Sequence, residues 1–333
     1  MNFVSPLTPN GGITTSKTNS PIGDGGLLLM KKVIQALFLA AISSPLFAQI
    51  QAPKELIQFY TQEWKGERFP DGRPKVPDEI VKRLANVSIE EAWGIMRGDG
   101  YNNQFEGNFQ IIHPEKPLVG RVLTAQYMPA RPDMEKPIKE KGKAEGRRGN
   151  TNSWPIDALQ INDVYVADGY GKIIDGTLIG DNLGNSIYAK SKTGVVFDAG
   201  VRDLEGLSAI DGFVGFTRGY DPSAIKDMTM TCINCPIRIG RASVLPGDLV
   251  LGKPEGVIFI PAHLAEKVVN QSEFIALQDE FGHKMLRENK FTPGEIDMKW
   301  SDAIKNAFRE HIKTRSGKVY LTSEQIEKFL SRE

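Results

Sequence analysis

The chain has 333 residues, 40% of them hydrophobic, which is enough to bury a full core in one large domain or two modest ones. Its 41 lysines and arginines balance its 41 aspartates and glutamates. The sequence therefore has no net charge to attract nucleic acid or anionic lipid, and we expect no nucleic-acid partner.

The first 48 residues predict a leader rather than a folded part. Residues 1–29 are rich in small and polar residues and precede a second methionine, so we interpret them as a miscalled or disordered N-terminus. In residues 30–48, a charged start at Met30, an apolar run and Ala48 before Gln49 are the three parts of a secretory signal peptide. Because the apolar run is short for a bilayer span, we expect cleavage, no stable membrane anchor, and export across the inner membrane to the periplasm.

A polar, proline-rich lead-in (49–84) precedes the first firm helix signal, a capping box at Ser88-Ile89-Glu90-Glu91. Beyond it, short β-rich runs alternate irregularly with helical stretches. We expect strands at 119–128, 163–167, 194–199, 212–216, 237–244, 249–251 and 257–260, and helices at 155–159, 182–192 and from 203 onward. The pattern predicts a compact mixed α/β domain over residues 85–261 rather than a regular doubly wound sheet.

The pattern changes to helix after Pro261. Apolar residues such as Val268, Phe281 and Met285 recur at helical spacing, and further helix starts follow. We expect residues 262–333 to form a C-terminal helical extension that packs on the core or on a neighbouring subunit.

Three features of the sequence carry weaker signals. The charge run 139–148, with two glycines, predicts a solvated loop without chemistry. Cys232 and Cys235 form a single C-x-x-C, for which two small buried residues or a local disulfide are favoured over a redox or metal role. The Asp168-Gly169-x-Gly turn lacks the third glycine and long helix of a nucleotide site, so we expect a hairpin or a short crossover turn.

The four histidines are scattered, and none stands at a metal-binding spacing. A metal would therefore be held by oxygen ligands, which favours Mg²⁺ or Mn²⁺. The sequence also lacks the Gly-x-Ser-x-Gly motif of serine hydrolases.

The most informative segment runs from Gly180-Asp181-Asn182-Leu183 to Arg202-Asp203. The first four residues lie at an expected helix start, where free backbone amides can receive a carboxylate. Arg202 follows an expected strand and can close on the same anion, and Asp203 beside it can bind a divalent cation. The alternative is a surface salt bridge of Arg202, with Gly180 only ending a turn.

Four segments occur in the order found in one known family. They are 154–157, 180–183, 200–207, and 244–250 together with 256–261. Through them, residues 85 to about 290 resemble the RraA-like family, which includes regulator of ribonuclease activity A and metal-dependent 4-hydroxy-4-methyl-2-oxoglutarate/4-carboxy-4-hydroxy-2-oxoadipate aldolases. Some members carry the older label demethylmenaquinone methyltransferase.

The resemblance implies a β/β/α swivelling-type α/β domain that assembles into trimers or hexamers with sites between subunits. In the aldolases, the residues matching Gly180, Asp181, Asn182 and Leu183 present amides to the pyruvyl carboxylate. Arg202 would bind the substrate, Asp203 would ligate Mg²⁺, and Asp181 would hold a water on the metal.

One position departs from the aldolase motif, and one expected residue lies outside that motif. The motif's final acid falls on Gly206, while Glu205 stands one position early. The aldolases also use a glutamate from the neighbouring subunit's C-terminal helix, for which Glu280 is our candidate.

The function that this resemblance implies is a divalent-metal-dependent lyase that cleaves a 4-hydroxy-2-keto acid to pyruvate, with oxaloacetate decarboxylation as a side activity. The alternative is a non-catalytic RraA-like binding or regulatory protein. Apart from the older family label, a methyltransferase activity is supported in the sequence only by the Asp168-Gly169 turn.

Overall fold

The structure is a computed structural model and describes residues 50–331. The predicted signal peptide and the stretch before it lie outside the described residues, so the leader and the export stay predictions. Residues from Gln49 onward cluster into one compact unit. Within residues 50–331, no helix is both long and apolar enough to cross a membrane.

Nine strands of the described chain form one sheet. They are β1 (Phe105–Glu106), β2 (Gln110–Ile112), β3 (Leu118–Pro129), β4 (Asp163–Thr177), β5 (Val195–Val201), β6 (Gly215–Tyr220), β7 (Met228–Ile233), β10 (Leu249–Lys253) and β11 (Gly256–Ile260). Their order is β1-β11-β10-β3-β4-β5-β6-β2, with β7 paired to β3. The central strands β3, β4, β5 and β6 are parallel, whereas the flanking pairs are antiparallel. A small second sheet pairs β8 (Ile237–Ile239) with β9 (Ala242–Val244).

The helices connect the parallel strands and extend the chain at both ends. They are α2 (Lys54–Tyr60), α3 (Asp78–Leu84), α4 (Ile89–Gly98), α5 (Pro132–Ala144), α6 (Trp154–Asp157), α7 (Asp181–Ser191), α8 (Leu204–Ser208), α9 (Ala265–Arg287), α10 (Pro293–Asp297), α11 (Asp302–Thr314) and α12 (Ser323–Leu330). α4 begins at the predicted capping box, where Ser88 Oγ accepts the Glu91 amide at 3.1 Å.

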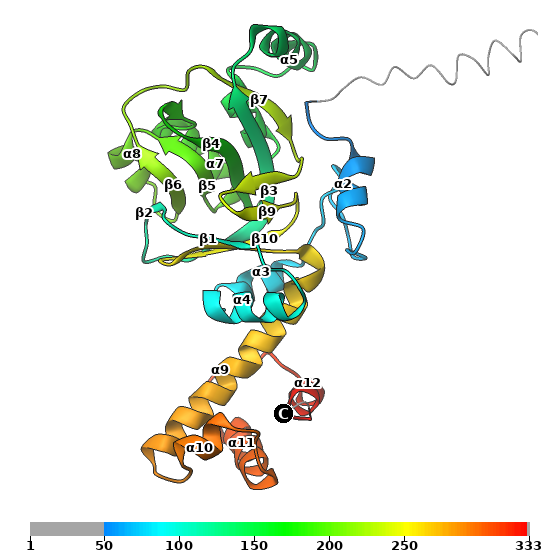
Figure 1. The fold of residues 1–333 in the computed structure, drawn as a ribbon, viewed down its shortest axis with the longest axis vertical. Coiled ribbons are helices and arrows are strands. Elements are labelled where there is room, and N and C mark those ends of the chain that lie inside the picture. Colours follow the sequence, from blue (N-terminus) through cyan, green and yellow to red (C-terminus); the bar gives the residue numbers. More distant parts are fainter. Residues whose placement is uncertain (1–49, 332–333) are drawn as a thin grey trace, which may run out of the picture. The chain divides into compact units, whose positions relative to one another are not determined.

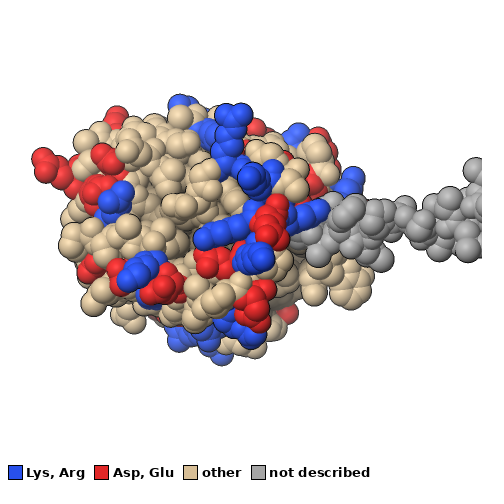
Figure 2. Space-filling model, turned by 90° about the horizontal axis from the view of Figure 1, so that it is seen from above, with Lys and Arg blue, Asp and Glu red and all other residues tan. Residues whose placement is uncertain are grey.

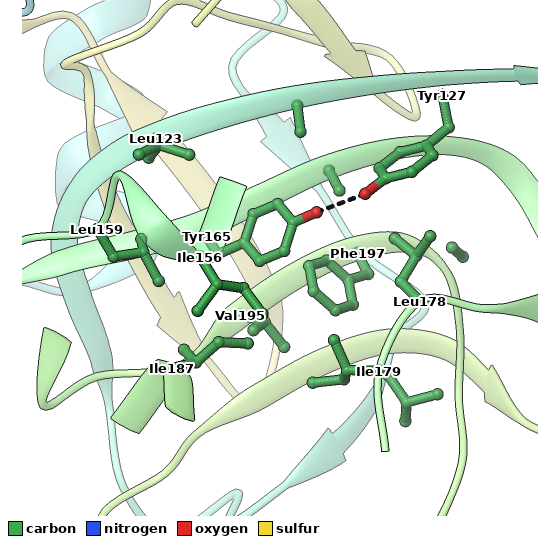
Figure 3. Packing of buried hydrophobic residues seen from close by; sticks show 14 of the residues in the cluster. Leu123, Tyr127, Ile156, Leu159, Tyr165, Leu178, Ile179, Ile187, Val195 and Phe197 are labelled. Carbon is green, nitrogen blue, oxygen red and sulfur yellow. Dashed lines mark hydrogen bonds between the residues drawn. The ribbon is translucent and has the colours of Figure 1, made fainter. Parts of the chain in front are cut away.

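The alternation of side chains along the central strands builds a core on each face of the sheet. In β4, Val164 and Val166 pack with β8 and β9, while Tyr165 and Ala167 face the side of α6, α7 and α8. On that second face the hydroxyls of Tyr127 and Tyr165 hydrogen-bond at 2.8 Å (Figure 3). A buried tyrosine pair thus satisfies its own polar groups within the core.

Two further hydrophobic clusters account for the remaining helices. Helices α3, α4 and the start of α9 cover β10 and β11 (Figure 1). Farther along α9, Phe281 makes edge-on ring contacts with Trp300 and Phe308, and α11 and α12 contribute to the same cluster. The mixed α/β fold with a C-terminal helical extension, expected from the sequence, is confirmed.

The lead-in is part of the folded unit because a buried arginine joins it to the sheet. Arg73 is fully buried, and its guanidinium contacts Asp71 at 2.8 Å and Asp163, the first residue of β4, at 3.0 Å. Its charged group also lies 5.0 Å from the centre of the Phe69 ring. Arg121 of β3 pairs in addition with Asp78 at the start of α3. Some charged residues of the polar lead-in therefore form internal ion pairs instead of facing solvent.

The predicted loop at 139–148 is wrong for residues 139–144, which belong to α5. Lys139 pairs with Glu135 one turn earlier at 2.6 Å. Gly142, read from sequence as a loop glycine, instead lets α5 approach Trp154, because a β-carbon there would collide with the indole ring. Figure 2 looks onto this end of the molecule and shows basic side chains with acidic ones between them.

Several predicted strands also differ from the structure. The run 237–244 is two strands separated at Gly240, whose φ of +56° turns the chain. Strand β6 begins at Gly215, whereas the predicted strand began at Gly212. Strands β1, β2 and β7 were not predicted. The expected hairpin or crossover turn at Asp168 is wrong, because β4 continues through it with a shift of register between Asp168 and Lys172.

The two cysteines are free thiols and half-buried, so the structure contains no local disulfide between them. Cys232 lies near the end of β7. A hydrogen bond between the two side chains lowers the pKa of Cys232 and raises that of Cys235.

Candidate functional site

Two neighbouring parallel strands bring the predicted site residues to one edge of the sheet. β4 leads into α7, and β5 leads into Arg202 and Asp203. The carboxyl ends of parallel strands lie at the same edge, where α/β proteins commonly bind ligands. Beyond the strands, the Leu178 amide donates to the Gly200 carbonyl at 3.0 Å, and the Arg202 amide to the Ile179 carbonyl at 3.0 Å. These bonds fix the two connecting segments side by side.

The segment before α7 is also anchored by side chains that pack in the hydrophobic core. Leu178 and Ile179 are buried and lie near Phe197 of β5 in the core (Figure 3). The residue that follows them, Gly180, is the N-cap of α7. The start of this helix is therefore held on the sheet by packed side chains and by backbone hydrogen bonds.

Gly180 is required here by space rather than by backbone conformation. Its φ of −119° is accessible to any residue. A β-carbon at this position, however, would collide with Asp203 Oδ2 and would lie 3.2 Å from Arg202 Nε. The structure thus brings Gly180, Arg202 and Asp203 into direct proximity.

Asp203 has an unusual backbone conformation that turns the chain into α8. Its φ of 55° and ψ of 47° are left-handed, a region that aspartate tolerates better than most residues. Its Oδ2 lies 3.6 Å from Arg202 Nε, and the two side chains are 40% and 44% exposed, respectively. Left-handed residues other than glycine are frequent at functional sites.

The first turn of α7 offers two backbone amides. The Asn182 amide donates to the Asp181 side chain at 2.7 Å, and the Gly184 amide donates to the Gly180 carbonyl at 2.9 Å. Within residues 50–331, the amides of Asp181 and Leu183 have no acceptor. The predicted amide-lined helix start is therefore partly capped by the protein itself, and two donors remain for an anion.

These donors and Arg202 line one cavity of about 350 Å³. Its wall is formed by residues 149, 150, 152 and 153 before α6, 177–183 at the start of α7, Arg202, and 224–225. Asn152, which was not among the predicted site residues, is 8% exposed, and its side-chain amide donates to the Leu178 carbonyl at 2.7 Å. Its position two residues before the Trp154-Pro155 segment was the available signal.

The position of the absent motif acid lies beside Asp181. A β-carbon on Gly206 would stand 2.7 Å from Asp181 Cβ and 2.9 Å from its Oδ2. A side chain at 206 would thus press on Asp181, and α7 and α8 approach closely because this residue is glycine. Glu205, the acid one position earlier, is exposed on α8.

Glu280 does not line this cavity in the single chain. It lies on α9, where its carboxylate contacts Arg315 at 2.7 Å and His311 at 3.2 Å. The hydrogen bond from Arg315 lowers the pKa of Glu280. Its predicted role in a neighbouring subunit's site stays a prediction.

The residues at the α7 edge fit a hard divalent cation by their donor chemistry. The described residues contain no group of three or more His, Cys, Asp or Glu side chains that could hold a metal ion. Mg²⁺, however, is commonly held by one or two carboxylates with water and substrate oxygens. Because Gly180 has no side chain, the Asp203 carboxylate beside it stays accessible. Asp181 Oδ2 accepts no hydrogen bond within residues 50–331. Asp203 and Asp181 are thus the two carboxylates at this edge that would be free to hold such a cation, directly or through water.

Comparison with known proteins places these residues in a family context. Protein DlpA of Legionella pneumophila is 29% identical over 204 residues, which cover 60% of this chain and 30% of DlpA. A protein of Halalkalibacterium halodurans named "Putative 4-hydroxy-4-methyl-2-oxoglutarate aldolase" is 30% identical over 127 residues, 38% of this chain and 60% of that protein. The matches therefore span less than two thirds of either relative.

A solved structure shows the same fold. Streptomyces coelicolor RraAS2, described as an unusual member of the RNase ES inhibitor RraA protein family, superposes with a TM-score of 0.55 at 23% identity. The superposition covers 63% of this chain and 99% of RraAS2. The model of the family described as "RraA-like: Aldolase/RraA" matches residues 85–259, more than half of the chain. The protein is therefore a member of the RraA-like family.

Proposed function

We propose that this protein is a divalent-cation-dependent lyase that cleaves a 4-hydroxy-2-keto acid to pyruvate. The observation that carries the proposal is the close approach of Asp203 and Arg202 to Gly180, next to a helix start with two unpaired amides. The similarity to a protein named as an aldolase gives the reaction class. Mg²⁺ or Mn²⁺ is the expected cofactor because the nearby ligands are carboxylate oxygens.

In this proposal the chain's own residues bind and orient the substrate. The amides of Asp181 and Leu183 receive the carboxylate of the 2-keto acid, with the positive end of the α7 dipole behind them. The Arg202 guanidinium, which has no hydrogen-bond acceptor within residues 50–331, donates to the keto oxygen as negative charge develops there. Asp203, with Asp181 acting through a water, would hold the cation, which would supply electrostatic stabilisation of the developing negative charge.

The cleavage needs no oxidant or second reactant, because the proton and the electron pair that it releases both return to the products. A base removes the proton of the C4 hydroxyl, the C3–C4 bond breaks, and C4 becomes a carbonyl carbon. The electron pair of that bond enters the pyruvate enolate, which then takes a proton at C3. We assign Asp181 to receive the hydroxyl proton through water, because its Oδ2 is uncommitted. With oxaloacetate, the same enolate would form as CO₂ leaves.

Gly206 is the observation that favours the second candidate, a binding protein without catalysis. The motif acid is absent at this position, and Asp181 occupies the adjacent space. Such a protein would bind a small carboxylate in the same cavity without turnover. Both candidates share the anion-binding geometry and differ in whether the cation site is catalytically competent.

We also propose assembly and location from the family and the leader. A homotrimer or hexamer would place Glu280 of one subunit near the site of another. The signal peptide would place the assembly in the periplasm, where its substrate would be a small 2-keto acid.

The proposal is tested by measuring pyruvate release from a panel of 4-hydroxy-2-keto acids and from oxaloacetate, with Mg²⁺ and with chelator. Chelator-sensitive release that Asp203→Ala abolishes would support the lyase. Mg²⁺-dependent binding of oxalate without pyruvate release from any substrate would favour the binding protein. Wild-type turnover in Asp203→Ala would refute the assignment.

A further inference from the structure

A second cavity, of about 360 Å³, lies where the lead-in meets the core. It shares no residue with the cavity at the start of α7. Its lining comes from the end of α2 and the residues after it, from the segment around Tyr101, from residues 243–248 and from the turn at Pro261. Residues 60–64 of the lead-in therefore complete this cavity against the rest of the fold.

Aromatic rings form much of its wall. Tyr60, Trp64 and Tyr101 all line it. Trp64 donates its indole N–H to the Glu67 carbonyl at 2.8 Å, and the Tyr101 hydroxyl is 3.1 Å from His263 Nε2. Because the polar groups of Trp64 and Tyr101 already have partners, these two rings present mainly their carbon surfaces to a ligand.

A buried carboxylate lies in the same wall without a cationic partner. Asp248 is 3% exposed, and its Oδ2 accepts the Leu245 amide at 2.8 Å. Within residues 50–331 it forms no ion pair, and burial raises its pKa to about 7. A buried carboxylate that lacks a cation is costly, so a positively charged ligand group would be stabilised beside it.

The other polar groups around the cavity are also suited to accept hydrogen bonds. Gln104 donates its side-chain N–H groups to the carbonyls of Phe259 and Ser243, at 2.9 and 3.3 Å, which leaves its oxygen as an acceptor. Glu63 adds a second carboxylate, and no lysine or arginine lines the cavity in the described part of the chain.

Two further titratable groups near the cavity do not neutralise the charge of Asp248 and Glu63. Burial lowers the pKa of His263, which keeps its imidazole neutral at pH 7 to 8. Asp99, which also lies near Tyr101 and His263, is held by Lys267 at 2.6 Å. Arg68 donates to Thr61 and to the Trp64 carbonyl from outside the lining and forms no ion pair with Asp248 or Glu63. The two carboxylates in the lining therefore have no cationic partner within residues 50–331.

We propose that this cavity binds a small organic amine, with its apolar body against Tyr60, Trp64 and Tyr101 and its ammonium group toward Asp248 and Glu63. Aromatic faces attract an organic cation, and a charge-assisted hydrogen bond to Asp248 completes the buried ion pair. The site is independent of the proposed lyase activity, since the two cavities share no lining residue.

Isothermal titration of the protein with phenethylamine at pH 8 tests the proposal. 3-Phenylpropionate and phenethyl alcohol are the matched anionic and neutral probes. We expect saturable one-to-one binding of the amine, and binding of the acid and alcohol that is weaker by about tenfold or more, the loss expected when a charge-assisted hydrogen bond is absent. Equal binding of the three probes, or no binding of the amine, would overturn the proposal.

Variants locate the binding to this cavity. Asp248→Asn, whose side-chain oxygen can still accept the Leu245 amide, should lower the affinity for the amine by about tenfold. Glu63→Gln, at an exposed position, should lower it by about threefold. Glu67→Gln, which alters an exposed residue outside the cavity, is the control and should bind as the wild type does. If Asp248→Asn fails to fold, Glu63→Gln and Trp64→Leu carry the test. Wild-type affinity in every folded cavity variant would contradict the assignment.

Lowering the pH from 8 to 6 separates the role of Asp248 from a general effect. Protonation of Asp248 should weaken amine binding in the wild type, and this pH dependence should be reduced in Asp248→Asn. Of the other groups around the cavity, burial raises the pKa of Tyr101, which stays neutral over this range, and burial lowers the pKa of His263. An unchanged pH dependence in Asp248→Asn would exclude Asp248 as the ammonium partner.

Discussion

The backbone amide of Arg202 donates to the carbonyl oxygen of Ile179 at 3.0 Å. This bond joins the segment after β5 to the segment before α7, one residue before the N-cap Gly180. It places a guanidinium and a carboxylate against the start of a helix without requiring either side chain to form a strong bond of its own. Both remain available to a ligand, with the 3.6 Å contact between Arg202 and Asp203 as their mutual interaction.

Gly180→Ala should reduce turnover by about 100-fold, because a displacement of catalytic groups by about 1 Å has an effect of that size. The added methyl group would collide with Asp203 Oδ2 and push the carboxylate away. The thermal midpoint should change little, since Gly180 has an ordinary backbone conformation. Gly94→Ala is the matched control, because its β-carbon would contact no other atom within 4 Å. Full activity in Gly180→Ala would show that the position of Asp203 is unimportant.

Asp203→Asn should lower metal-dependent pyruvate release by at least about 100-fold, as expected when a ligand of a catalytic cation loses its charge. The shape of the side chain is conserved, and asparagine also tolerates the left-handed backbone. Glu205→Gln, two residues later and exposed, should retain wild-type activity. If Glu205→Gln were the more damaged variant, the early acid would have replaced the motif acid at the cation.

Arg73→Met should destabilise the fold by about 3 to 5 kcal/mol, because it leaves the buried Asp163 carboxylate without its cation. Urea unfolding followed by circular dichroism measures this change. Arg131→Met is the control, since its pair with Asp133 is exposed and should contribute nothing measurable. A loss as small as that of Arg131→Met would mean that the lead-in is not anchored through Arg73.

Asp248 should make the protein less stable as the pH rises from about 4 to about 7. Its folded-state pKa of about 7 exceeds the ordinary value of 3.8, so between these values the folded state holds a proton that the unfolded state releases. The pKa difference corresponds to about 4 kcal/mol at most. Denaturant unfolding of wild type and Asp248→Asn at several pH values isolates this contribution, because the variant lacks the titrating group. Parallel pH profiles would contradict the raised pKa.

The sequence predicted β3 and β5 well because each is an apolar run bounded by Gly or Pro, but it predicted only the first five residues of β4 and the first two of β6. It failed where tertiary contacts decide the outcome. Gly142 marks a loop by local rules, yet its lack of a side chain lets a helix pack on Trp154. β1 and β2, of two and three residues, are too short to be recognised, and they form because neighbouring strands offer free edges.

The candidate site was predictable in its sequence positions and less so in its contacts. Gly180, Arg202 and Asp203 lie together in the structure, but their assigned roles stay predictions. The capping of Asn182 by Asp181 could not be foreseen, because a side chain's choice between its own backbone and a ligand depends on its rotamer. Asn152 comes from a distant segment, and only the fold brings it to the Leu178 carbonyl.

The most direct test of the site is a crystal structure of the protein with Mn²⁺ and oxalate, in which anomalous scattering locates the cation. We predict Mn²⁺ on the Asp203 carboxylate, with oxalate bridging the cation, the amides of Asp181 and Leu183, and the Arg202 guanidinium. Mn²⁺ bound elsewhere, or oxalate absent from these two amides, would contradict the account.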